Sequence, residues 1–165
     1  MQTICRNSLI GLTLCWFCAS CATAMSHGPI DLDVKEIDGK PAVCLPASDD
    51  TGSDPIRISR VGVSRETGVA SPAVDYWDEV VPASAPAVYL KRGECLVYGQ
   101  TVPGAIINTP AKPLDANNYY TAAIVPVGES GPVYGAIFCV LRQANGANRI
   151  AVPGKQHNPC ASLGD

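Results

Sequence analysis

Ionisable side chains with a spacing suited to acid–base chemistry cluster at one place in the sequence. Asp75, Asp78 and Glu79 surround the aromatic pair Tyr76 and Trp77. Two carboxylates work as an acid–base pair only where burial separates their pKa values, which a sequence does not show. An acidic outer face with the indole packed inward, or a patch that binds another protein, needs no such separation. We therefore treat these five residues as candidate contacts for a protein partner and not as catalytic residues.

No other residues form a recognisable catalytic set. The two histidines, His27 and His157, stand near opposite ends of the expected domain, whereas a functional histidine needs an orienting partner in a pocket. Asp49, Asp50 and Asp54 lie close enough to suggest a calcium loop, but they do not follow the EF-hand order and fit a solvated turn better. We predict no catalytic residue, no metal and no cofactor. A hydrolase is the remote alternative, because no nucleophile–base pair is visible.

Eight cysteines divide equally between an N-terminal segment and the rest of the chain. The second group comprises Cys44, Cys95, Cys139 and Cys160. None of these four has CxxC spacing or a nearby histidine, which argues against a zinc site. In an oxidising compartment four cysteines suggest two disulfides, and any of the three pairings is open. A bridge to Cys160 would tie the C-terminal tail to the domain.

The N-terminal segment has the pattern of an export signal. Arg6 is its only charge, and residues 9–19 form an apolar run shorter than the roughly 20 residues of a transmembrane helix. Residues 22–24 read Ala-Thr-Ala, a cleavage site that would release a soluble protein. Residues 18–21 resemble a bacterial lipobox, which would lead to lipidation of Cys21. Of these two outcomes we expect lipidation of Cys21. The lipidated protein would be anchored to the outer membrane, because Ala22 rather than aspartate follows the cysteine.

Length and composition indicate one exported domain. The chain has 165 residues, of which 47% are hydrophobic and 16% charged, with 15 glycines and 14 prolines that disfavour long helices. Without the leader, the chain has 11 basic and 15 acidic residues. This acidic balance argues against binding to nucleic acid, which requires a basic surface. We expect a signal peptide over 1–20, or over 1–24 if cleavage follows Ala24. A linker (21–29), a β domain (30–152) and a C-terminal tail (153–165) would follow.

Hydrophobic residues recur with a period of two, which is typical of half-buried strands. In the expected strand at 30–37, apolar and charged residues alternate up to Lys35, and Asp38-Gly39 is a hairpin turn pair. Residues 56–63 alternate with a slip near Arg60 that suggests a bulge. Further strands are expected at 41–45, 73–81, 87–90, 95–98, 119–126, 133–141 and 149–152. About seven to nine short antiparallel strands separated by turns predict an all-β, disulfide-stabilised sandwich.

One local motif narrows this prediction. Leu114, followed by a tight turn and by Tyr120, resembles the tyrosine corner of immunoglobulin-like and fibronectin type III domains. In that motif the tyrosine hydroxyl bonds to the backbone a few residues upstream and locks the crossover between the sheets. The resemblance implies that residues 120–126 and 133–141 are the last two strands of such a sandwich.

The order of several short segments resembles a known family. They are Val43-Cys44, ECLVYG at 94–99, the Leu114–Tyr120 corner and FCV at 138–140. Together they resemble small periplasmic proteins of Gram-negative bacteria, mostly lipoproteins, that serve as immunity proteins of the type VI secretion system. The resemblance implies a protein without enzymatic activity that binds and neutralises a toxic effector in the periplasm. The alternative is an accessory or structural envelope lipoprotein.

Two segments are candidate contacts for such a toxin. One is the cluster at 75–79, and the other is the proline-rich stretch at 102–113, which is too long for a simple hairpin connection. The acidic balance of the domain favours a basic protein partner. Contact with a membrane is expected only through a lipid on Cys21.

Overall fold

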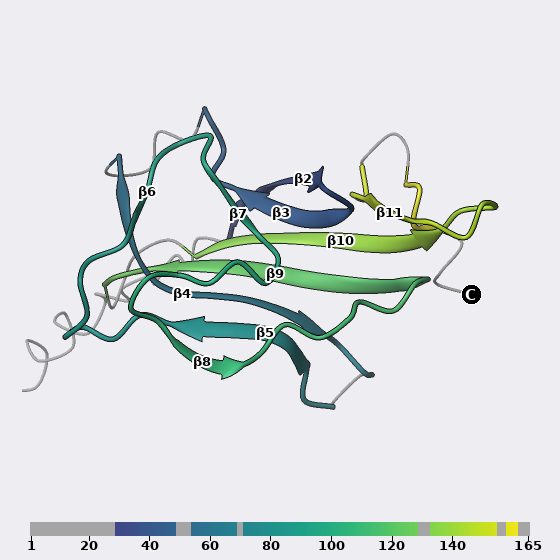
Figure 1. Ribbon diagram of the computed structural model, residues 1–165. Helices are drawn as coiled ribbons and strands as arrows, with labels where there is room; N and C mark the ends of the chain where they lie inside the picture. Colours follow the sequence, from purple (N-terminus) through teal and green to yellow (C-terminus); the bar gives the residue numbers. More distant parts are fainter. Residues whose placement is uncertain (1–28, 49–53, 69–70, 129–132, 155–157, 162–165) are drawn as a thin grey trace, which may run out of the picture.

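The computed structural model describes residues 29–48, 54–68, 71–128, 133–154 and 158–161 (Figure 1). The predicted leader with Cys21, most of the linker and both histidines lie outside the described residues, as do Asp49 and Asp50. No helix that could cross a membrane is found in the described part of the chain.

About half of the described residues lie in strands, and none lies in an α-helix. The all-β prediction is thereby confirmed. The strands are β1 (Ile30–Asp31), β2 (Asp33–Ile37), β3 (Lys40–Cys44), β4 (Ile56–Arg65), β5 (Val74–Val80), β6 (Tyr89–Leu90), β7 (Cys95–Val97), β8 (Ile106–Thr109), β9 (Asn118–Pro126), β10 (Tyr134–Arg142) and β11 (Asn148–Ala151).

The strands form two sheets (Figure 1). The larger sheet has the order β1-β10-β9-β4-β5-β8, with β11 paired to β10 and β6 paired to β4. The smaller sheet has the order β2-β3-β7. All pairings are antiparallel except that of β1 with β10. In the figure the smaller sheet lies on one side of β10 and β9.

Side chains from both sheets meet in one hydrophobic core. Val43 and Leu96 come from the smaller sheet, and Trp77, Tyr120 and Phe138 from the larger one; all are buried. Tyr120 stacks on Phe138 with ring centroids 5.5 Å apart. Edge and stacked ring pairs add to the stabilisation that buried apolar area already gives.

The predicted hairpin turn and the predicted β-bulge are both present. Asp38 and Gly39 both have positive φ (50° and 74°) and join β2 to β3 in a hairpin. The register of β4 against β9 shifts between Ile58 and Arg60, the expected bulge. The turn before β7 does not join paired strands: β6 pairs with β4, whereas β7 pairs with β3. The chain crosses from one sheet to the other at this turn.

Two disulfides are present, as predicted, and the structure selects the pairing. Cys44 of β3 is bonded to Cys95 of β7, its direct cross-strand partner. Cys139 of β10 is bonded to Cys160, which holds the C-terminal segment on the outer side of the larger sheet. The Tyr119 hydroxyl donates to the Cys160 carbonyl at the same place. The tail is therefore tied to the domain body.

Candidate functional site

The cluster at 75–79 lies on β5 and is mostly interior. Tyr76, Trp77, Asp78 and Glu79 are buried, and Asp75 alone is exposed. The expectation that all five contact a partner is corrected by this burial. The register of β5 against β4 shifts between Val63↔Trp77 and Ser64↔Asp75, so Tyr76 has no opposite residue.

The shift places two consecutive aromatic rings in the core. Tyr76 packs edge-on against Tyr120, with centroids 5.1 Å apart, and Trp77 packs edge-on against Tyr98, with centroids 5.7 Å apart. A regular strand would turn one of two neighbouring side chains outward. The bulge therefore explains why this cluster is part of the core rather than a surface patch.

The two buried carboxylates of β5 position the segment at 102–113. Glu79 accepts hydrogen bonds from Trp77 Nε1 (3.0 Å) and from the backbone N–H of Val102 (2.8 Å). Asp78 accepts hydrogen bonds from Arg60 Nε (2.5 Å) and Asn108 Nδ2 (2.8 Å). The hydrogen bond to Asp78 raises the pKa of Arg60 above its ordinary value. Because every one of these carboxylate contacts is made within the domain, their role is to hold neighbouring elements in place.

The segment at 102–113 contains an exposed strand at the edge of the larger sheet. Strand β8 pairs with β5 on one side, and no described strand pairs with its other side. Ile106 and Ile107 are 57% and 48% exposed. An edge strand presents unpaired backbone donors and acceptors, and proteins usually protect such an edge with charged residues. Two adjacent exposed isoleucines at an open edge form a candidate site for a protein partner. We call the Ile106–Thr109 strand, with these two side chains, the β8 edge.

The tyrosine corner has the hydrogen bonds that its sequence motif implies. The Tyr120 hydroxyl accepts from the Asp115 N–H (2.8 Å) and lies 3.2 Å from the Asp115 carbonyl, to which it donates. Leu114 packs against the core beside it. Burial raises the pKa of Tyr120 to about 12, so the phenol keeps its proton to higher pH than an exposed tyrosine does. Its partner Asp115 also accepts from Tyr76 and Arg65, which extends the network to β5 and β4.

We expect Tyr120→Phe to lower the free energy of unfolding by about 1.5 kcal/mol, because it leaves a partly buried backbone donor without a partner. Urea denaturation measures the change. Tyr89→Phe is the matched control, since Tyr89 is 56% exposed and should alter stability by less than about 0.5 kcal/mol. Equal effects for the two variants would contradict the structural role of the corner.

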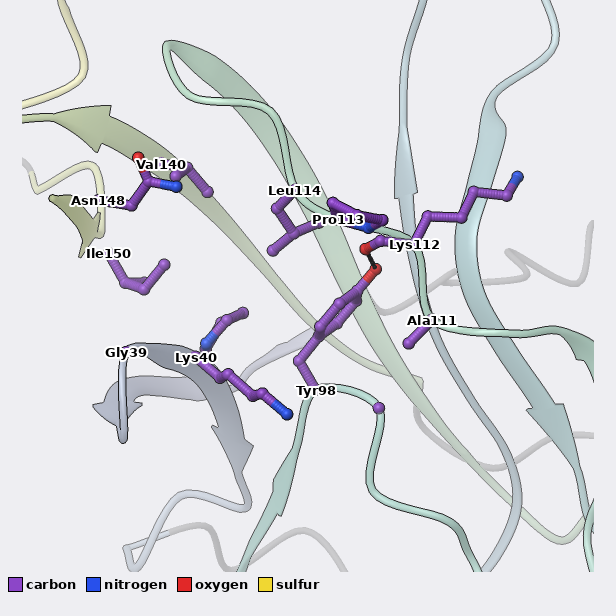
Figure 2. A pocket seen from close by; sticks show the side chains of 12 residues that line it. Gly39, Lys40, Tyr98, Ala111, Lys112, Pro113, Leu114, Val140, Asn148 and Ile150 are labelled. Atoms are coloured by element: carbon purple, nitrogen blue, oxygen red, sulfur yellow. Dashed lines mark hydrogen bonds between the residues drawn. The ribbon is translucent and has the colours of Figure 1, made fainter. Parts of the chain in front are cut away.

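A groove of about 420 Å³ lies between the β2–β3 hairpin, β11 and the chain that leads into β9 (Figure 2). Its lining comprises Gly39, Lys40, Pro41, Tyr98, Gly99, Ala111, Lys112, Pro113, Leu114, Val140, Asn148 and Ile150. One wall is the ring of Tyr98, whose hydroxyl donates to the Lys112 carbonyl at 2.7 Å. The same wall is tight at Gly99, where a Cβ would lie 2.9 Å from Ala111 Cβ.

The sequence indicates the segment at 102–113 as a candidate contact, but it predicts neither the exposed strand β8 within it nor the groove. Residues 102–113 stood out for their length and prolines, but which side chains are exposed depends on the pairing of β8 with β5. The groove draws its lining from segments that are far apart in the chain, so no local spacing could have signalled it. In the described residues no group of three or more His, Cys, Asp or Glu side chains is arranged to hold a metal ion.

Comparisons with family models, curated proteins and solved structures gave no match.

Proposed function

We propose that this protein is a non-enzymatic binding domain that docks a protein partner on the β8 edge. The observation that carries the proposal is the pair of exposed isoleucines, Ile106 and Ile107, on a strand whose outer side pairs with no described strand. An extended segment of a partner can add to such an edge through main-chain hydrogen bonds, while pockets for alternate side chains give specificity.

The β8 edge is held rigidly, which favours binding. Asn108 bonds to the buried Asp78, and the chain just before the strand is held by the bond of Val102 N–H to the buried Glu79. A preorganised surface loses less conformational freedom when a partner docks. The two buried carboxylates thus support binding indirectly, by fixing the segment that carries the isoleucines.

We further propose that the domain is an immunoglobulin-like sandwich. The proposal is supported by the hydrogen-bonded Tyr120 corner at the start of β9 and by the antiparallel pairing of β9 with β10. In this assignment β9 and β10 correspond to the last two strands of an immunoglobulin domain, and β11, which pairs with β10, follows them.

The biological role that we propose is that of a type VI secretion immunity protein, which neutralises a toxic effector by binding it. The proposed location is the periplasm, with an outer-membrane anchor on Cys21. The two disulfides support an oxidising compartment. An inhibitor that blocks the active cleft of a toxin needs a rigid scaffold and a contact surface, and it needs no catalytic residue of its own.

Affinity capture from periplasmic extract, followed by mass spectrometry, tests this role. We expect the wild-type domain to retain a toxin-like protein in stoichiometric amount. The double variant Ile106→Lys/Ile107→Lys should bind that protein at least about tenfold more weakly, because it places two charges in the centre of the contact.

Ile137→Lys is the matched control for this experiment. Ile137 is 54% exposed on β10, away from β8, so its replacement should leave binding unchanged. Circular dichroism and thermal melting would show that both variants fold. Retention of the partner by the double variant would exclude the β8 edge as the contact. Recovery of envelope structural proteins alone would favour the accessory-lipoprotein alternative.

A further inference from the structure

The groove beside Tyr98 has the composition of a site for an amphipathic molecule. Pro113, Leu114, Val140 and Ile150 contribute apolar side chains to its lining, and Figure 2 shows Leu114, Val140 and Ile150 directed toward a common space. A volume of about 420 Å³ falls within the range of small-molecule sites, roughly 300–1,000 Å³. An apolar molecule of several carbons would therefore find contacts on more than one side.

The charges at the groove have a single sign. Among the described residues that line it, Lys40 and Lys112 alone are charged. The Lys112 ammonium contacts β5 and not the groove. It donates a hydrogen bond to the Asp75 carbonyl (2.9 Å) and lies 5.9 Å from the centroid of the Tyr76 ring. Figure 2 shows its side chain running away from the groove, whereas that of Lys40 extends toward Tyr98. Lys40 is thus the cation that a bound molecule would meet.

Nearby acidic and polar groups do not neutralise this lysine. No described residue forms an ion pair or a hydrogen bond with the Lys40 ammonium. Glu36, on the same hairpin, accepts a hydrogen bond from the Ile150 N–H at 2.8 Å and so links the hairpin to β11. An apolar groove with one unpaired ammonium at its side is complementary to an apolar body that carries a single negative charge.

We propose that this groove binds a small amphipathic carboxylate. The apolar body lies against Leu114, Val140 and Ile150, and the carboxylate lies beside the Lys40 ammonium. The site is separate from the β8 edge in residues and in chemistry, so this inference does not depend on the proposed partner.

Titration of the isotopically labelled domain with octanoate, followed by NMR, tests the proposal. We expect saturable shifts of the backbone amides of Gly99, Ala111 and Leu114. Octanol has the same chain without the charge and should bind about threefold more weakly, as expected for an ion pair with an exposed lysine. Octanoate that shifts no groove amide, or that binds no better than octanol, would overturn the proposal.

Two charge-reversal variants distinguish an ion pair between octanoate and Lys40 from a general effect of the net charge on binding. Lys40→Glu should weaken octanoate binding about tenfold and leave octanol binding unchanged. Lys35→Glu makes the same change in net charge on the same hairpin, at an exposed residue outside the lining, and should leave both unchanged. Equal weakening by both variants would contradict a specific site at Lys40. The amide spectra themselves report whether each variant is folded.

Discussion

Replacing Cys44 and Cys95 together by alanine is expected to lower the free energy of unfolding by about 4 kcal/mol. The bridge joins residues 51 positions apart, and it therefore removes much of the conformational freedom of the unfolded chain. Its sulfur atoms also link two strands of the smaller sheet, which has only three strands. Since domains of this size are stable by about 5–15 kcal/mol, the loss would be a large part of the total.

The second disulfide provides the comparison. Cys139 and Cys160 lie 21 positions apart, and their joint replacement by alanine should cost about 3 kcal/mol. Urea denaturation of both double variants without reductant measures the two values. A loss below about 1 kcal/mol for the Cys44/Cys95 variant would show that this bridge does not constrain the unfolded chain as we infer.

Trp77→Ala is expected to lower the free energy of unfolding by about 4 kcal/mol, because it removes a large side chain that is 1% exposed. The change leaves a cavity beside Tyr98 and deprives Glu79 of one of its two donors. Denaturation in urea measures the loss. Asp75→Ala, at the exposed residue of the same strand, should change stability by less than about 0.5 kcal/mol.

The same variant also decides between two roles for the indole. If Trp77→Ala kept its stability but lost the captured partner, Trp77 would be a contact residue and its burial would not describe the functional state. The structure leads us to expect the opposite result, in which stability falls and any effect on binding follows from the loss of folded protein.

Local sequence patterns were sufficient to predict most of the strands and turns. They did not predict β8, and they did not show that residues 30–37 divide into β1 and β2, which belong to different sheets. The alternation that begins at Ile30 and the Asp38-Gly39 pair predict the β2–β3 hairpin, because both depend on neighbouring residues alone. The hydrogen bonds of Tyr120 to Asp115 were likewise implied by a motif that spans only seven residues. Such features need no knowledge of how distant segments pair.

The surface of the protein could not be predicted in this way. The burial of Trp77 depends on a register shift between β4 and β5, which the sequence pattern of either strand alone does not reveal. The exposure of Ile106 depends on β8 being the last strand of its sheet. The disulfide pairing depends on which strands are neighbours, and so does the groove around Lys40. Each of these is a long-range property of the fold.

Hydrogen–deuterium exchange of the domain, alone and in complex with its captured partner, shows whether the partner docks on the β8 edge. We predict slower amide exchange at β8 in the complex, because a docked segment would pair with its open edge, and unchanged exchange at Ile137 on β10. Unchanged exchange at β8, with protection elsewhere on the domain, would contradict the account.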